Sequence, residues 1–123
     1  MDPSQTKLLK LYAGSMTSAA ARHLLTYLVD YGMSLRSHSF TLRDKGYLHT
    51  GRYEVDGKWP YAFIVNRVSV LFYVRRAGRT NPAASLDSLV HHFPDAKQNN
   101  RGEIQFHVNS EAEARVLMNK LFE

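Results

Sequence analysis

Arginine recurs through the middle of the chain, where several copies could hold one anion together. Residues 43–79 carry eight cations against three anions, a net charge of +5, whereas residues 80–123 carry a net charge of −2. Guanidinium groups bind phosphate or carboxylate through two parallel hydrogen bonds. We therefore predict that this region binds an anionic partner. The predicted contact residues are six cations and one aromatic: Arg52, Lys58, Arg67, Arg75, Arg76, Arg79 and Trp59.

Aromatic rings are interleaved with these cations, which is typical of a nucleic-acid surface. Cations neutralise phosphates while flat rings stack on exposed bases. Trp59 is flanked by Lys58 and Pro60 just after a hairpin signal, so we expect its ring to stay partly exposed. The competing interpretation is a solvated, charged sheet face whose rings mostly fill the core. The aromatics concerned are Tyr47, Tyr53, Trp59, Tyr61 and Tyr73.

The segment from Arg75 to Arg79 is the strongest part of this pattern. Three arginines surround a glycine at the point where a strand is expected to end. Binding residues often lie on loops that a rigid scaffold holds in place. The predicted function is therefore a small, non-enzymatic binding module, and the predicted partner is DNA, RNA or a nucleoprotein complex.

His49 offers a different chemistry. It shares a strand face with tyrosines and has Arg52 on the opposite face, so its imidazole could act as acid or base on a phosphodiester without a metal. A small metal-independent nuclease is therefore one alternative function, and cross-strand packing is the competing role for this histidine. Another alternative is a phage- or mobile-element-type interaction or inhibitor module, whose arginines meet an acidic protein surface.

No other motif predicts catalysis. The sequence has no phosphate loop, dinucleotide fingerprint, zinc-protease helix or nucleophile elbow. It has no cysteine, which excludes disulfides, thiolate metal ligands and a cysteine nucleophile. His91 and His92 are adjacent on an expected helix, so they point about 100° apart and do not chelate one ion together. We predict no metal and no cofactor.

Length and composition predict a single domain over residues 1–123, with 44% hydrophobic content to form one core. Residues 1–5 lack the basic flank and apolar block of a signal peptide. The longest wholly apolar runs, residues 61–65 and 70–74, are too short to span a bilayer. These features predict a cytoplasmic protein without membrane association.

Two helices are expected before the first strand. Residues 7–12 predict a short helix. Residues 19–31 predict a longer one that is capped by Thr17 or Ser18 and stopped by Gly32. Five apolar residues at helical spacing should form its buried stripe. These are Ala21, Leu24, Leu25, Leu28 and Val29.

Two further helices are expected in the C-terminal half. A loop at residues 77–82 leads to a helix over residues 83–93, which Pro94 ends. Ser110 and Glu113 stand at capping-box spacing before the last helix.

Alternating apolar and polar residues predict the strands. Asp56-Gly57 signals a two-residue hairpin, and Asn66-Arg67 a second tight turn. Pro60 suits an edge strand or a strand entrance. An exposed edge at the Pro60 strand or at the Glu103 strand could pair across a dimer axis, so the oligomeric state stays open. The predicted strands are residues 35–42, 47–55, 58–65, 68–75 and 103–108.

The resulting order is ααββββαβα. It predicts an α+β domain with an antiparallel β-meander of about four to five strands, because the hairpin strands are mostly consecutive and the helices are grouped at the ends.

Overall fold

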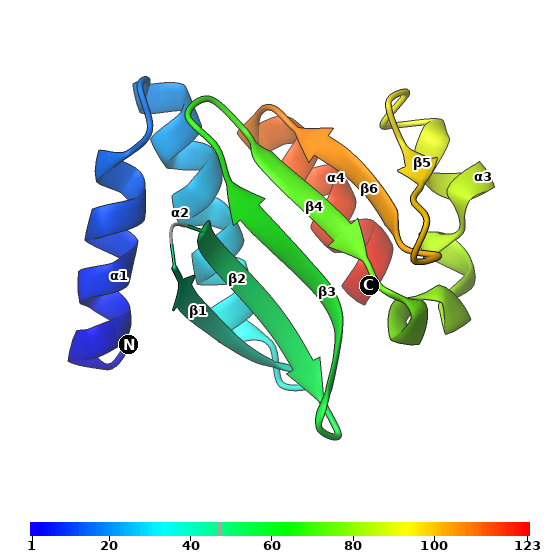
Figure 1. The fold of residues 1–123 in the computed structure, drawn as a ribbon, viewed down its shortest axis with the longest axis horizontal. Helices are drawn as coiled ribbons and strands as arrows, with labels where there is room; N and C mark the ends of the chain where they lie inside the picture. The colour runs from blue at the N-terminus through cyan, green and yellow to red at the C-terminus, as the bar shows by residue number, and fades with distance from the viewer. Residues whose placement is uncertain (47) are drawn as a thin grey trace.

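One antiparallel sheet forms the frame of the protein, as Figure 1 shows for a computed structural model that describes residues 1–46 and 48–123. Its six strands lie in the order β1-β2-β3-β4-β6-β5. This confirms the predicted α+β class and the antiparallel meander. The strands are β1 (Ser39–Lys45), β2 (Leu48–Val55), β3 (Lys58–Val65), β4 (Val70–Val74), β5 (Lys97–Gln98) and β6 (Ile104–Val108).

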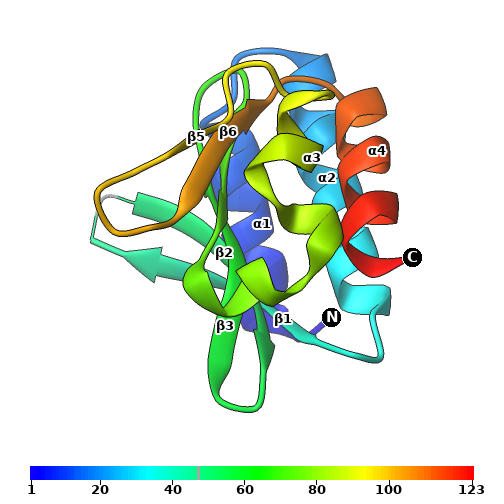
Figure 2. The same ribbon diagram turned by 90° about the vertical axis from the view of Figure 1, so that its right-hand side faces the viewer.

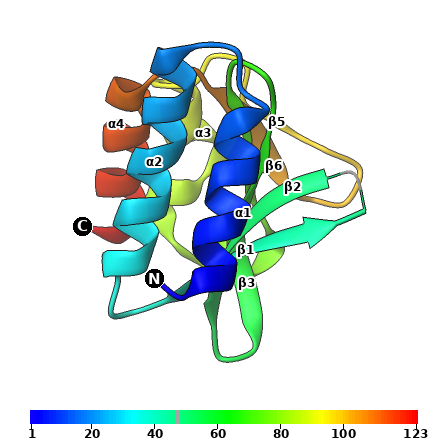
Figure 3. The ribbon, with the colours of Figure 1, turned by 90° about the vertical axis from the view of Figure 1, so that its left-hand side faces the viewer.

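Helices cover only one face of the sheet in the described part of the chain (Figure 2). Helices α2 and α4 lie side by side on that face, and α1 lies along β1 (Figure 3). We call the uncovered side the open face. No helix among the described residues is long and apolar enough to cross a membrane. The α-helices are α1 (Pro3–Gly14), α2 (Ala19–Ser34), α3 (Leu86–Val90) and α4 (Glu111–Phe122).

The α2 helix follows its sequence signals except at its end. The Ser18 hydroxyl accepts a hydrogen bond from the Ala21 N–H at 3.1 Å, and the whole predicted stripe is buried. The predicted stop at Gly32 is wrong, because the helix continues to Ser34. Gly32 serves packing instead, since a Cβ there would lie 2.6 Å from Cγ of Phe40.

Capping residues also define α1 and α4. Ser110 and Glu113 begin α4 as predicted, with the Ser110 hydroxyl accepting from the Glu113 N–H at 3.1 Å. The α1 helix begins at Pro3, earlier than the predicted residue 7. The missed signal is Asp2, whose carboxylate accepts from the Ser4 N–H at 2.8 Å and caps the first turn.

The two hairpin turns have different outcomes. Asp56 and Gly57 have φ of 53° and 74°, which confirms the tight turn, because a two-residue type I′ loop needs positive φ at both positions. The second turn is longer than predicted, since Val65 pairs with Val70 and residues 66–69 form the loop. Val68, predicted to begin the next strand, is therefore in this loop and 60% exposed.

The prediction also differs from the structure at β1 and β5. The strand expected at residues 35–42 is β1, which begins later and runs on to Lys45. The short β5 was not predicted. Tyr47, the first residue of the predicted second strand, lies outside the described residues.

Short helices replace the loop and the single helix predicted for residues 77–93. Two 3-10 helices, Arg76–Thr80 and Pro82–Ala84, precede α3. Gly78 allows the first of them to pack closely, since a Cβ there would lie 2.8 Å from the Pro60 carbonyl oxygen. Ser85 caps α3 by accepting from the Ser88 N–H at 3.2 Å, so the helix begins later than predicted.

Pro60 lies in an inner strand, because β3 pairs with both β2 and β4. The edge alternative is therefore wrong, but the strand-entrance alternative is confirmed. The register of β2 against β3 shifts between Tyr53 and Val55, so the proline, which has no N–H, sits beside an irregularity in the ladder. Its carbonyl oxygen still accepts a hydrogen bond from the Arg75 N–H at 2.8 Å.

The true edges of the sheet are β1 and β5. At β1 the Gln5 side chain acts as a short substitute strand: its amide oxygen accepts from the Leu42 N–H at 2.6 Å, and its amide nitrogen donates to the Leu42 carbonyl at 3.1 Å. At the other side β5 has only two residues and carries Lys97. A covered edge and a short, charged edge both discourage pairing with another chain.

Candidate anion-binding groove on the open face

Strand alternation determines which side chains reach the open face. In β4, Val70, Phe72 and Val74 are buried beneath the helices, while the intervening Leu71 and Tyr73 point the other way and are partly exposed. The register then aligns residues of four neighbouring strands in one row across the open face. That row is Arg52, Ala62, Tyr73 and Gln105.

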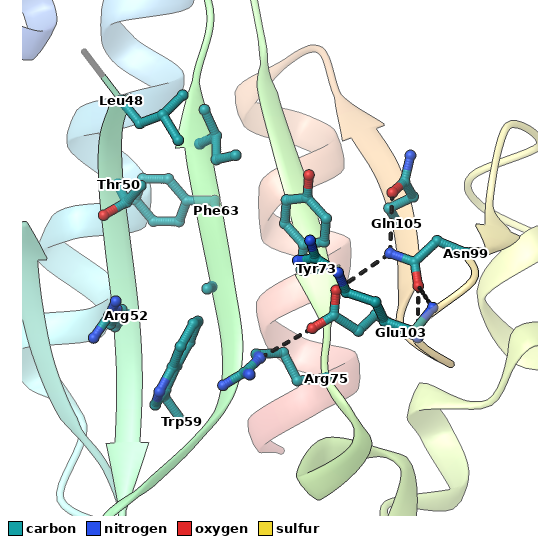
Figure 4. A pocket seen from close by; sticks show the side chains of 13 residues that line it. Leu48, Thr50, Arg52, Trp59, Phe63, Tyr73, Arg75, Asn99, Glu103 and Gln105 are labelled. Carbon is teal, nitrogen blue, oxygen red and sulfur yellow. Dashed lines mark hydrogen bonds and ion pairs between the residues drawn. The ribbon is translucent and has the colours of Figure 1, made fainter. Parts of the chain in front are cut away.

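A groove of about 430 Å³ lies over this row, which we call the central groove (Figure 4). Ala62 is the smallest side chain in the row, so it leaves the middle of the floor low. One end of the groove, the apolar end, is lined by Leu48, Ile64 and Tyr73. The other, the cationic end, is lined by Arg52, Arg75, Arg101 and Trp59.

Trp59 lies between two guanidinium groups at the cationic end (Figure 4). The guanidinium carbon of Arg52 is 4.0 Å from the ring centroid, and that of Arg75 is 3.4 Å away. Cations are attracted to the faces of an indole ring by its quadrupole. Because the two arginines cover opposite faces of the ring, Trp59 orients the cations and offers no open face for a base.

The charge at the cationic end is only partly neutralised. Arg75 pairs with Glu103, with 3.1 Å between Nε and Oε2. Arg52 forms no ion pair with the described residues. Burial, and next the positive charge of Arg43, lower the pKa of Arg52 below its ordinary value, and Arg75 adds to the effect. A bound anion would offset this repulsion and favour the charged form of Arg52.

The loop between β5 and β6 forms the far wall of the groove, and Asn99 organises it. Its side-chain oxygen accepts from the N–H groups of Arg101 and Glu103 at 2.9 and 3.0 Å. Its amide nitrogen donates to Oε1 of Glu103 at 3.2 Å and to Oε1 of Gln105 at 3.4 Å. The wall therefore has a defined shape before any ligand binds.

The 3-10 helix after β4 supports the same loop from outside. Arg76 donates from Nε to the Arg101 carbonyl at 2.9 Å, and Arg79 donates from Nη1 to the Gly102 carbonyl at 3.1 Å. These bonds leave both guanidinium charges without a carboxylate partner in the described residues. A second hollow, of about 500 Å³, adjoins Trp59, and its lining includes Lys58, Arg76 and Arg101.

Five of the seven predicted contact residues are thus brought together around the central groove and the adjoining hollow. Arg79 lies behind the β5–β6 loop, as its bond to Gly102 shows. Arg67 is separate, in the loop between β3 and β4 at the opposite end of β3 from Lys58 (Figure 1). Its carbonyl accepts from the Thr17 N–H at 2.9 Å, which ties that loop to the start of α2.

His49 lies on the helix-covered side of β2, away from the groove arginines. Its ring stacks on Tyr12, with 4.4 Å between ring centroids and 8° between planes. Burial, and next the charge of Asp44, raise the pKa of Tyr12 to about 12, so this phenol stays neutral. Within the described residues, no three histidine, aspartate or glutamate side chains gather as a metal-binding group.

Sequence reasoning missed the contribution of the β5–β6 loop. Residues 98–102 contain Arg101 and the organising Asn99, and neither was among the predicted contact residues. The Asn, Arg and Gly of this segment are only a weak local signal for a binding loop. Only the pairing of β4 with β6 places this loop opposite Arg75.

Fold and groove together define a class: an α+β domain with a one-sided antiparallel sheet and a cationic groove on its open face. No protein-family description, curated protein or solved structure matches this chain.

Proposed function

We propose that this protein is a non-enzymatic binding module that holds nucleic acid through phosphate contacts on the open face. The observation that carries the proposal is the stack of Arg52 and Arg75 on the two faces of Trp59. A cation–π contact uses only the flat face of a guanidinium, so its N–H edge stays available to a phosphate. Of the two arginines, only Arg75 pairs with a carboxylate among the described residues.

Pre-organisation makes this arrangement favourable for binding. A free arginine loses side-chain entropy when it is immobilised on a ligand. Here the indole and the organised β5–β6 loop already restrict the side chains at the cationic end. Lys58, Arg76 and Arg101 add charge around the adjoining hollow. Several cations on one surface support a salt-dependent, sequence-independent attachment to phosphates.

An acidic protein surface is the alternative partner, in line with an interaction or inhibitor module. The apolar end of the groove favours this candidate, because Leu48 and Ile64 would suit an apolar side chain of such a partner. The nuclease alternative receives no comparable support, since His49 stacks on Tyr12 away from the groove.

The test removes three charges and keeps the aliphatic stems. The triple variant Arg52→Met, Lys58→Met, Arg101→Met should weaken binding to labelled DNA and RNA of every sequence. It should also lower the slope of log affinity against log salt concentration by up to about three, one for each phosphate that is no longer neutralised. Fluorescence anisotropy titrations at several salt concentrations measure both quantities.

The control carries the same loss of charge at a distance from the groove. Lys7, Lys10 and Arg36 are exposed and make no side-chain hydrogen bond or ion pair with the described residues. Their triple change to methionine should leave the salt slope near the wild-type value. Equal effects of the two triple variants would show that net charge alone drives binding. Wild-type protein that binds neither DNA nor RNA at micromolar concentration in low salt would refute the nucleic-acid proposal.

A further inference from the structure

The central groove joins two different surfaces within a single hollow. Leu48, Ile64 and Tyr73 at its apolar end are only partly buried, although the alternate residues of the same strands lie in the core. The cationic end begins at Arg52, which lies in the same row as Tyr73 and one row on from Ile64. A nucleotide combines the same two properties, a flat base and a charged phosphate. The groove is therefore complementary to a nucleotide as a whole, beyond its phosphate.

The walls of the groove limit what can enter. Strands β1 and β2 and the β5–β6 loop extend from the sheet away from the helices (Figure 2), and residues of β2 and of this loop line the central groove on either side of β3 and β4. Bases in a duplex are paired and stacked inside the helix, so they present only their edges in the grooves. A duplex could contact the arginines through its phosphates but would leave the apolar end empty. An unpaired base can reach the floor.

Tyr73 is the ring on the floor that a base can stack on. Both faces of Trp59 are covered by guanidinium groups. Tyr73 instead has Ala62 as its neighbour in the row, and the short side chain of Ala62 leaves space beside the ring within the central groove. Its hydroxyl makes no hydrogen bond to the described residues. Burial, and next the charge of Glu103, raise the pKa of Tyr73, so the phenol stays neutral and does not repel phosphate.

From this juxtaposition we infer that the partner is single-stranded nucleic acid, with one base stacked on Tyr73 above Ala62 and the flanking phosphates held by Arg52 and Arg101. The inference rests on the proposed function and narrows it to unpaired strands. It assigns Trp59 to positioning the arginines and Tyr73 to contacting the base.

The experiment compares Tyr73→Ala with Tyr73→Phe on three probes. These are a labelled mixed-sequence single strand, the matching duplex, and a strand of the same length whose sugars carry no bases. Loss of one base–ring stack should weaken binding of the ordinary single strand by about tenfold to a hundredfold in Tyr73→Ala. Tyr73→Phe keeps the ring and should retain wild-type affinity. Binding of the duplex and of the baseless strand should be the same in all three proteins.

The control uses Tyr27, a partly buried tyrosine on the helix-covered side, whose ring has the Arg115 guanidinium carbon 4.5 Å from its centroid. Tyr27→Ala should leave binding of every probe unchanged. Thermal melting of each variant reports whether it is folded. If Tyr73→Ala melts near the assay temperature, Tyr73→Leu replaces it, because leucine keeps much of the apolar contact area without an aromatic face.

The outcomes separate this inference from the proposed function. Equal binding of single strand, duplex and baseless strand, abolished only when the arginines are removed, would leave the proposed function intact and overturn the single-strand inference. No binding of any probe would overturn both. Preference for the single strand that depends on the ring at residue 73 would support both.

Discussion

The stack on Trp59 makes a prediction that can be measured without any ligand. If the ring and Arg52 attract each other, removing both should cost less stability than the sum of the two single changes. The cycle uses Arg52→Met, which keeps the aliphatic stem, Trp59→Leu, which keeps an apolar side chain, and the double variant. Arg52 suits the cycle better than Arg75, because Arg75 also pairs with Glu103.

The geometry sets the size of the coupling. The Arg52 guanidinium carbon lies 4.0 Å from the ring centroid, well inside the range of a cation–π contact. Such contacts are worth about 0.5–1 kcal/mol at exposed sites and about 2 kcal/mol when desolvated. Arg52 is partly buried, and burial is the main cause of its lowered pKa. We therefore expect a coupling free energy of about 1 kcal/mol between Arg52 and Trp59.

Urea unfolding followed by far-UV circular dichroism measures the four stabilities. Tryptophan fluorescence does not serve, because Trp59 is the only tryptophan and two of the four proteins lack it. A parallel cycle with Lys58→Met is the control, since Lys58 is exposed and has no cation–π contact with the ring among the described residues. Its coupling with Trp59 should be near zero.

A coupling for Arg52 below about 0.3 kcal/mol, the usual error of additivity, would refute the reasoning. Trp59 would then be a partly exposed ring with no role in holding the arginines. The arginines would then not be held in place before a phosphate binds.

Three further predictions follow from burial and charge. Leu28→Ala and Leu117→Ala should each lower the free energy of unfolding by about 2–5 kcal/mol, because both side chains are 0% exposed; losses below about 1 kcal/mol at both sites in urea unfolding would show the helix faces to be assigned wrongly. His49→Ala should leave nucleic-acid affinity unchanged, and the wild type should not hydrolyse RNA or DNA; chelator-resistant turnover that disappears in this variant would replace the binding proposal with a nuclease. Burial alone would raise the pKa of Asp95, but hydrogen bonds from the backbone and ring of His107 outweigh burial and lower that pKa. The ionised Asp95 therefore stabilises the folded state above about pH 4, and this stabilisation is lost as the pH falls through the lowered pKa. The melting temperature should therefore fall less steeply with decreasing pH in Asp95→Asn than in the wild type. The same acid dependence in both proteins would count against a stabilising contact between Asp95 and His107.

Elements with strong local signals were predictable from the sequence. The apolar stripe and Ser18 cap located α2, and Ser110 located the start of α4. The Asp56-Gly57 turn located the end of β2 and the start of β3, because a type I′ turn joins two strands by two residues with positive φ. In each case the deciding interactions lie within a few residues of one another.

Features that depend on distant contacts were not predictable in this way. Val68 continues the apolar alternation of β4, yet it lies in a loop because Val65 pairs with Val70. Gly32 resembles a helix stop, yet Phe40 packs against it from β1. In both cases tertiary packing overrides the local sequence signal.

The roles of the two aromatic rings at the candidate site also depend on contacts between residues far apart in the sequence. In the sequence, Trp59 stands between a lysine and a proline, which suggests an open ring for stacking. The register of the sheet brings Arg52 and Arg75 to it from its two sides, so its faces are occupied. That same register puts Ala62 beside Tyr73 and leaves this second ring accessible. Which aromatic orients the cations and which is open to a base is therefore decided by strand pairing, and neither composition nor spacing along the chain contains that information.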